Sequence, residues 1–92
     1  MNPRGAYSQV AVQQLDGMEA ASDMDLYNGI LENCHLIFQK PKQAQSFSTA
    51  IATDKGILFQ LPVPGFPPFK IFWSSEGPTI EAVFAYPRDY SE

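Results

Sequence analysis

The groups best suited to chemistry crowd together near the C-terminus, in the run Tyr86-Pro87-Arg88-Asp89-Tyr90. The planar guanidinium of Arg88 can bind two oxygens of one phosphate group. Tyr90 can donate a proton as an acid, or stack on a base as aromatic side chains do with single-stranded RNA. A structural alternative stays open, because an exposed ion pair between Arg88 and Asp89 is ordinary and stabilises a protein little.

Two lysines can add positive charge to such a site. Lys55 lies in the predicted turn Thr53-Asp54-Lys55-Gly56, and Lys70 lies in the predicted strand Phe69–Ser74. Because Lys70 alternates with apolar neighbours, its side chain is predicted to leave the apolar face of that strand. Both a functional sheet face and plain solvent exposure are consistent with this pattern.

The chain has too few cysteine and histidine residues for a disulfide or a metal site. Cys34 is the only cysteine, so no internal disulfide can form, and its place on an apolar helical face predicts a small core residue. His35 is the only histidine, and neighbours on a helix do not face each other. We therefore expect no metal site and no cofactor.

The charge distribution limits the classes of partner. Six Lys and Arg residues against ten Asp and Glu residues give a net charge of −4. Through Asn33 the chain has one base, Arg4, and five acids, whereas the remainder has five of each. Broad nonspecific binding of nucleic acid needs many cations that neutralise phosphates, so the composition argues against it and allows only a local positive patch.

The length of 92 residues suits a single domain spanning 1–92, with residues 1–5 as a loose N-terminal segment. A hydrophobic content of 45% is ordinary for a globular protein. No apolar run approaches the ~20 residues of a transmembrane helix, and the N-terminus lacks the layout of a signal peptide. We therefore expect no membrane partner and a cytoplasmic location.

The clearest predicted element is a helix over 22–40. Ser22 is a suitable N-cap, and Pro41 ends the helix. Leu36 departs from the apolar stripe and is predicted to point outward, which suggests a second contact surface. The stripe has the spacing of one helical face and consists of Leu26, Tyr27, Ile30, Leu31, Cys34, Ile37 and Phe38.

Short alternating or apolar runs separated by turn residues predict the strands. A helical turn is expected over 15–21, a polar link over 42–46, and a stiff loop over 62–68, which holds four of the eight prolines. The order predicts an α+β fold, in which one main amphipathic helix packs on a small antiparallel sheet of four to five strands. The predicted strands are 6–13, 47–53, 57–63, 69–74 and 79–86.

Three motifs in this order resemble the RelE/ParE superfamily of toxins from type II toxin–antitoxin systems. The predicted helix is followed by Gly56-Ile57-Leu58-Phe59-Gln60-Leu61, similar to the family's Gly-x-(aromatic or aliphatic)-x-Leu strand. Phe69-Lys70-Ile71-Phe72-Trp73 is similar to its aromatic–basic–Ile–aromatic–aromatic strand. Ile80-Glu81-Ala82-Val83-Phe84 leads into a tail with Arg and Tyr, as in its closing strand. The resemblance covers residues 26–90.

The resemblance implies a RelE-like fold and a toxin that cleaves mRNA on the ribosome, or a degenerate relative. Such an endoribonuclease would need no metal. It would use Arg88, Tyr90, Lys70 and Tyr86 as catalytic residues, and Lys55 and Lys70 as RNA-binding residues. Cleavage through the 2′-hydroxyl needs a base, an acid and cations for the developing phosphate charge. The implied partners are an antitoxin, which would cover the sheet with a helix or strand, and the ribosome with its mRNA.

A second hypothesis follows from the places where the chain departs from this family. The chain is acidic, Pro62 stands where the family usually has a basic residue, and the 62–68 loop is longer than the family's tight turn. A non-enzymatic interaction module would use the acidic helix and this rigid loop, with Leu36 and an exposed Phe66 as partner-binding residues. Small-ligand binding between helix and sheet is also left open.

Overall fold

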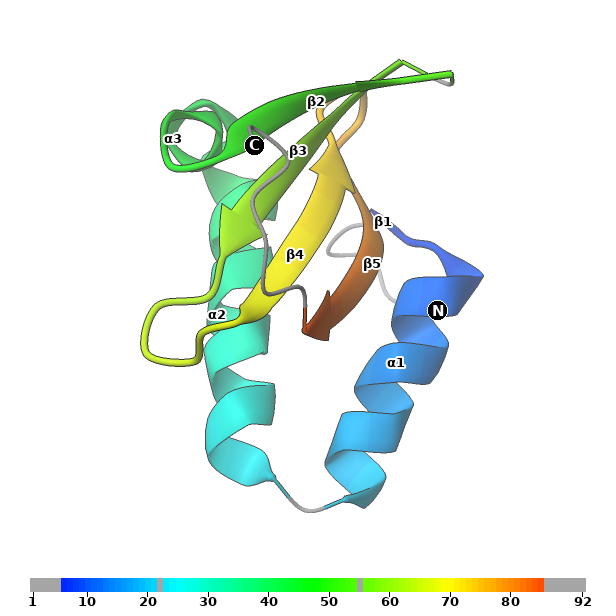
Figure 1. Ribbon diagram of the computed structural model, residues 1–92, viewed down its shortest axis with the longest axis vertical. Coiled ribbons are helices and arrows are strands. Elements are labelled where there is room, and N and C mark those ends of the chain that lie inside the picture. The colour runs from blue at the N-terminus through cyan, green and yellow to red at the C-terminus, as the bar shows by residue number, and fades with distance from the viewer. Residues whose placement is uncertain (1–5, 22, 55, 86–92) are drawn as a thin grey trace.

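A computed structural model shows helices packed on one face of a sheet (Figure 1). It describes residues 6–21, 23–54 and 56–85. The α+β class predicted from the sequence is confirmed. The helices are α1 (Gln9–Ala20), α2 (Met24–Gln39) and α3 (Pro41–Ser46). The strands are β1 (Ala6–Tyr7), β2 (Thr49–Thr53), β3 (Gly56–Pro62), β4 (Phe69–Ser74) and β5 (Thr79–Ala85).

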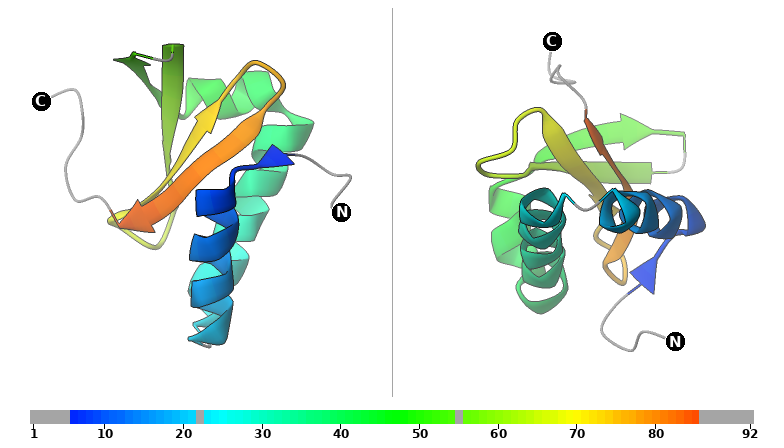
Figure 2. Two further views of the ribbon diagram at one scale, coloured as in Figure 1. Left: turned by 90° about the vertical axis from the view of Figure 1, so that its right-hand side faces the viewer. Right: turned by 90° about the horizontal axis from the view of Figure 1, so that it is seen from below.

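The strands follow the order β1-β5-β4-β3-β2 across the sheet. β2 to β5 form the predicted antiparallel meander, whereas β1 is two residues long and pairs parallel with β5. α1 and α2 lie on the same side of the sheet (Figure 2). We call the opposite side the outer face.

The main predicted helix is confirmed as α2, with a different N-cap. Asp23 caps it, since its carboxylate accepts a hydrogen bond from Leu26 N–H at 3.5 Å. Ser22, the predicted cap, lies outside the described residues. The apolar stripe faces the sheet as expected, and its most deeply buried members are Leu26, Ile30, Cys34 and Ile37.

The strand predicted over 6–13 is wrong over most of its length, because this region begins the 12-residue helix α1. The alternation of Val10 and Val12 suggested a strand, but both side chains are about half exposed, at 54% and 43%. Ala11 and Leu15 are buried instead, and their spacing of four residues is that of one helical face.

The side chains of Ser8, the N-cap of α1, and Gln14, within α1, form hydrogen bonds with β5. These bonds lie near an irregularity in the β4–β5 pairing. Ser8 Oγ accepts from Ala11 N–H at 3.0 Å, which caps the helix, and donates to the carbonyl of Glu81. Gln14 Oε1 accepts from Val83 N–H at 2.6 Å. These bonds join elements about seventy residues apart, so helix α1 is fixed by tertiary contacts that short-range patterns do not reveal.

The polar link predicted over 42–46 is also wrong, because it forms helix α3. Pro41 occupies the first turn of α3, where its missing N–H would have no helical partner. Ala44 is buried in the core. Ser48 Oγ donates to Ala44 O at 2.7 Å and accepts from Trp73 Nε1 at 3.2 Å, which connects the end of α3 to the sheet.

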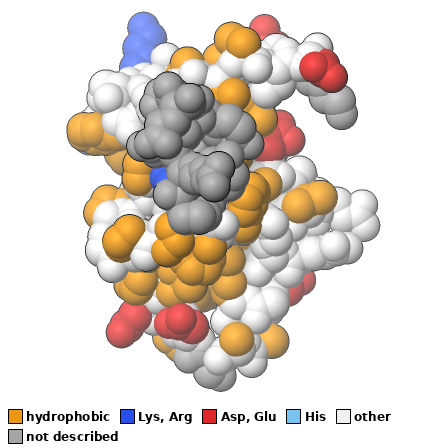
Figure 3. Space-filling model, in the orientation of Figure 1, with side chains coloured by type: hydrophobic (Ala, Val, Ile, Leu, Met, Phe, Trp, Pro, Cys, Tyr) orange, Lys and Arg blue, Asp and Glu red, His pale blue; other side chains and the backbone are white. Residues whose placement is uncertain are grey.

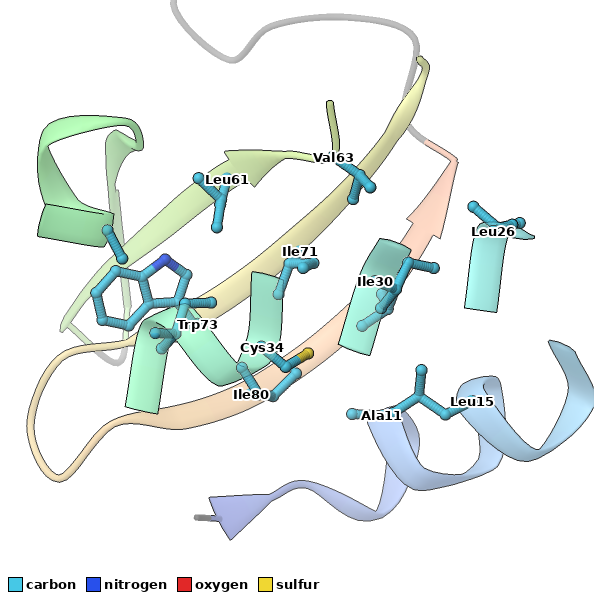
Figure 4. Packing of buried hydrophobic residues seen from close by; sticks show 13 residues of the cluster. Ala11, Leu15, Leu26, Ile30, Cys34, Leu61, Val63, Ile71, Trp73 and Ile80 are labelled. Carbon is cyan, nitrogen blue, oxygen red and sulfur yellow. The ribbon is translucent and has the colours of Figure 1, made fainter. Parts of the chain in front are cut away.

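One hydrophobic core fills the space between the sheet and the helices (Figure 4). Trp73 is fully buried at one end of it, with the ring of Phe59 at a centroid distance of 5.0 Å. Cys34 is fully buried near the middle, as predicted for a small core residue. Among the described helices, none combines the length and the apolar content that crossing a membrane requires.

Candidate functional site

Most of the residues predicted for catalysis or RNA binding fall outside the described part of the chain. Arg88, Tyr90, Tyr86 and Lys55 all lie in the ranges that the structure does not describe. Their roles therefore stay predictions. Lys70 is the one predicted catalytic residue whose surroundings are known.

Lys70 lies on the outer face of the central strand β4, and only 8% of it is exposed. Its register partners are Pro62 of β3 and Phe84 of β5. Plain solvent exposure, one of the two interpretations that the sequence left open, is therefore wrong: a long side chain on a central strand can pack its stem against the side chains of the neighbouring strands. Nearby, Phe72 stacks on Phe84 with ring centroids 4.9 Å apart. In its described part this face is thus mainly apolar rather than broadly cationic.

The two residues predicted to bind a partner, Leu36 and Phe66, do come together. Both line a groove between α2 and the 62–68 loop that joins β3 to β4. We call this hollow the α2–loop groove. Asp25, Asn28, Gly29, Glu32, Asn33 and Pro64 complete its lining.

The ring of Phe66 lies directly against α2 at Gly29. A Cβ atom at Gly29 would approach Phe66 Cε2 to 2.9 Å and Cδ2 to 3.2 Å, so glycine is what lets the ring lie this close. Phe66 and Leu36 are partly buried and pack against the core cluster. The predicted exposure of Phe66 and the outward orientation of Leu36 are therefore wrong in part, since each contacts the core as well as the groove.

Hydrogen bonds within the loop hold Phe66 in this position. Val63 N–H donates to Phe69 O at 3.1 Å, Phe66 N–H to Val63 O at 3.1 Å, and Phe69 N–H to Phe66 O at 2.8 Å. Gly65 supplies the φ of +83° that the turn requires. Prolines on both sides restrict the backbone further. The loop wall of the groove is thus set by the chain itself.

The described lining of the groove has negative charge and no lysine or arginine. Asp25 and Glu32 are exposed on α2, with Asn28 between them, and their spacing places all three on one side of the helix. Asn33 Nδ2 donates to Gly29 O at 2.8 Å, which anchors that amide to the helix. Figure 3 shows acidic side chains beside apolar surface at the lower end of the molecule, where α2 begins.

Two observations on the described residues concern metal binding and nucleophilic chemistry. Within the described residues, no three of His, Cys, Asp and Glu lie grouped so as to hold a metal ion. Burial raises the pKa of the Cys34 thiol to about 12, so it is a poor nucleophile at neutral pH. An apolar floor flanked by carboxylates is typical of a surface that binds a peptide or protein.

Sequence reasoning singled out Leu36 and Phe66, which line the groove, but missed Gly29, which allows the ring to approach the helix. Glycine inside a helix costs about 1 kcal/mol relative to alanine. An interior helical glycine can mark close packing, but Gly17 in α1 meets no neighbour, so the sequence alone does not tell the two apart. Asn28 and Asn33 gave no comparable signal, because asparagine on the polar side of a helix is ordinary.

A second hollow lies between the β2–β3 turn and the β4–β5 turn. Its lining includes the acids Asp54, Glu76 and Glu81. Ser74 Oγ donates to Glu81 Oε2 at 3.1 Å, so this carboxylate already has a partner within the chain. The lining is acidic like that of the α2–loop groove but has no aromatic floor, and we assign it no function.

In comparisons with known proteins, no protein-family model, no curated protein and no solved structure matches this chain. The choice of candidate site therefore rests on the geometry and charge of the α2–loop groove.

Proposed function

We propose that this protein is a non-enzymatic interaction module whose α2–loop groove binds a short segment of a partner protein. The segment would insert one apolar side chain between Leu36 and Phe66 and place Lys or Arg residues beside Asp25 and Glu32. The observation that carries the proposal is the combination of an apolar floor and two exposed carboxylates in one groove.

The apolar floor supports a single anchoring side chain. Fully burying a Leu or Phe side chain contributes about 1.5–3 kcal/mol, and such anchors supply most of the energy of small interfaces. Leu36 and Phe66 offer only part of their surface, because their other sides pack against the core. A short segment with one anchor fits this limited area, and the complex is expected to be transient.

The carboxylates support selection for a basic segment. Ion pairs at the rim of an interface add little affinity, but they orient the partner and speed its approach. Because the chain has a net charge of −4, its overall field also favours a basic partner over an acidic one. Binding should therefore weaken as salt is raised.

The rigidity of the loop supports binding without a large ordering cost. Binding a partner costs free energy for every side chain and loop that becomes fixed. The internal hydrogen bonds of the loop and its prolines fix Phe66 beforehand, so that cost falls mainly on the partner segment.

The toxin interpretation stays a prediction beside this proposal. Among the described residues, Lys70 is the only lysine or arginine on a strand, so no run of basic residues marks that part of the sheet. The test is to induce the protein alone in a bacterial host, beside an Arg88→Ala/Tyr90→Ala variant. Arrest of growth and translation by the native chain alone would support a toxin. No arrest with soluble, folded protein would contradict it in that host.

The groove is tested by selecting displayed random peptides on the full chain and counter-selecting on a Glu32→Lys variant. We expect enriched peptides to have one large apolar residue flanked by Lys or Arg. A synthetic copy of an enriched peptide should bind more than about tenfold more weakly to Glu32→Lys, because the reversal places like charges opposite each other. It should lose affinity to a similar degree for Leu36→Ala, by fluorescence anisotropy.

Glu76→Lys is the matched control, because it makes the same charge reversal in the β4–β5 turn, outside the groove. It should reduce affinity far less than Glu32→Lys does. The proposal fails if no enriched peptide distinguishes the native chain from Glu32→Lys. It also fails if both reversals weaken binding equally, since the peptides would then respond only to net charge.

A further inference from the structure

One long edge of the sheet has no strand beside it in the described part of the chain. β2 is the last strand in the sheet order and pairs with β3 on one side. Its five residues include no charge and no proline, and all except Ile51 are exposed. Proteins usually protect such an edge with Lys, Pro or a very short strand, because its free N–H and C=O groups are a template for further pairing. The opposite edge, β1, is two residues long.

The sequence of β2 fits a second copy of itself. Thr49-Ala50-Ile51-Ala52-Thr53 reads the same in both directions. An antiparallel pair of two β2 strands about a two-fold axis at Ile51 therefore places each residue type opposite its own kind. Thr49 lies opposite Thr53 of the second copy, Ala50 opposite its Ala52, and the two Ile51 side chains face each other. Cross-strand Thr–Thr and β-branched pairs are favourable in sheets.

The faces of the two sheets also match in this register. Residues directly opposite each other in an antiparallel pair share a face. In the observed sheet Ile51 of β2 lies opposite Leu58 of β3, so these two residues share a face. Gln60 is two residues after Leu58 and therefore on that same face, where it lies opposite Phe72. Phe72 and Lys70 are on the outer face, so Ile51 is on the outer face too. An Ile51–Ile51 contact would extend this mainly apolar face across the junction. No other register pairs all five residues of both strands.

Charge favours this edge for self-association. Two copies of a chain with net charge −4 repel each other wherever their acidic surfaces meet. β2 is neutral along its whole length, so two copies can approach there without placing like charges opposite each other. Phe47, just before β2, is 58% exposed and adds apolar surface near the same edge.

We propose that two copies of this chain associate through β2, in antiparallel register centred on Ile51, and join their sheets into one continuous sheet. The proposal is independent of the α2–loop groove, which shares no residue with β2.

Disulfide trapping tests both the association and its register on the full chain. In the proposed pair the two Ile51 Cβ atoms lie about 4.5–5.5 Å apart, so Ile51→Cys should form a disulfide-linked dimer under mild oxidation. Thr49→Cys should not link to itself, because the two copies of this residue lie roughly 13 Å apart. A mixture of Thr49→Cys and Thr53→Cys should form the mixed dimer. Cys34 is fully buried and can stay in place.

A charge exchange at the axis tests the association without a covalent bond. Ile51→Lys and Ile51→Glu should each weaken the dimer by about tenfold or more in sedimentation velocity, because like charges then lie opposite each other. Mixing the two variants should restore a dimer, which shows that each one is folded and that the lost association was electrostatic. Ile51→Val should associate as the native chain does.

The native chain should move from monomer to dimer as its concentration rises from micromolar to millimolar. The proposal is overturned if the native chain stays monomeric over this range. It is also overturned if a dimer forms but Ile51→Cys does not cross-link it, or if Ile51→Lys associates as strongly as the native chain. Those last two results would place the interface on another surface.

Discussion

Replacing Gly29 by alanine should destabilise the protein, although alanine is the better helix former. The gain in helix propensity is about 1 kcal/mol. The added Cβ would lie 2.9 Å from Phe66 Cε2, whereas carbon atoms prefer a separation of about 3.5–4.0 Å. The ring must therefore move by more than half an ångström, against a loop held by its own hydrogen bonds and prolines. Such overpacking costs about 1–3 kcal/mol, so we expect a net loss of about 1 kcal/mol.

Gly17 provides a matched control in helix α1. It is exposed, and a Cβ there meets no atom within 4 Å. Gly17→Ala should therefore show the propensity gain alone and stabilise the protein by about 1 kcal/mol. Urea unfolding followed by the fluorescence of Trp73, the single tryptophan, measures both variants. With a slope near 1–2 kcal/mol per molar, each change should shift the midpoint by about 0.5–1 M, in opposite directions.

A double-mutant cycle assigns the loss to Phe66. In a Phe66→Ala background the added methyl group has room, so Gly29→Ala should stabilise the protein about as much as Gly17→Ala does. The groove-binding peptide should lose affinity for Gly29→Ala, because the displaced ring no longer forms the floor. If Gly29→Ala stabilises the native chain as much as Gly17→Ala does, Phe66 does not pack on Gly29 and the geometry of the groove is wrong.

Three further predictions concern polar and titratable groups that are buried or partly buried. Gln60 is 1% exposed and its Nε2 has no hydrogen-bond partner among the described residues, so Gln60→Met should raise the urea midpoint. Gln14→Ala removes the acceptor of Val83 N–H and should cost about 1–2 kcal/mol in the same assay, whereas the exposed Gln13→Ala should change little. The pKa of Cys34 is raised from 9.0 to about 12 in the folded state, so the unfolded chain loses this proton first. The contribution of this pKa shift to the free energy of unfolding should be complete below pH 9 and decline towards pH 12. A Cys34→Val variant should lack this part of the pH dependence of stability.

Helix α2 and strands β3 to β5 could be predicted from the sequence because their signals are local. In β3 to β5, apolar runs end at turn residues, and the observed strands agree with the predicted ones to within about a residue where both are described. α2 has a strong apolar stripe and a proline after it. In such segments propensity, periodicity and termination indicate the same element, so few tertiary contacts are needed to decide it.

Helix α1 and the candidate site were harder to predict because tertiary contacts decide them. Val10 and Val12 have the alternation of a strand, yet Ser8 and Gln14 bond to β5 and fix the segment as helix α1. At the candidate site, Leu36 and Phe66 were identified separately, but their meeting depends on Gly29, 37 positions before Phe66. Lys70 lies opposite Pro62 of β3 and Phe84 of β5, neighbours that a single-strand pattern does not contain.

The edge strand β2 departs from what folding alone would favour, whereas Gly29 does not. Gly29 weakens α2 by about 1 kcal/mol relative to alanine, but the ring of Phe66 packs against it and explains its presence. β2 leaves a neutral, exposed edge of the kind that stable monomers protect with charge or proline. Departures from local rules are expected where a sequence serves binding as well as folding. That this departure occurs in a domain of 92 residues, whose stability margin is small, is therefore an argument for function at the edge.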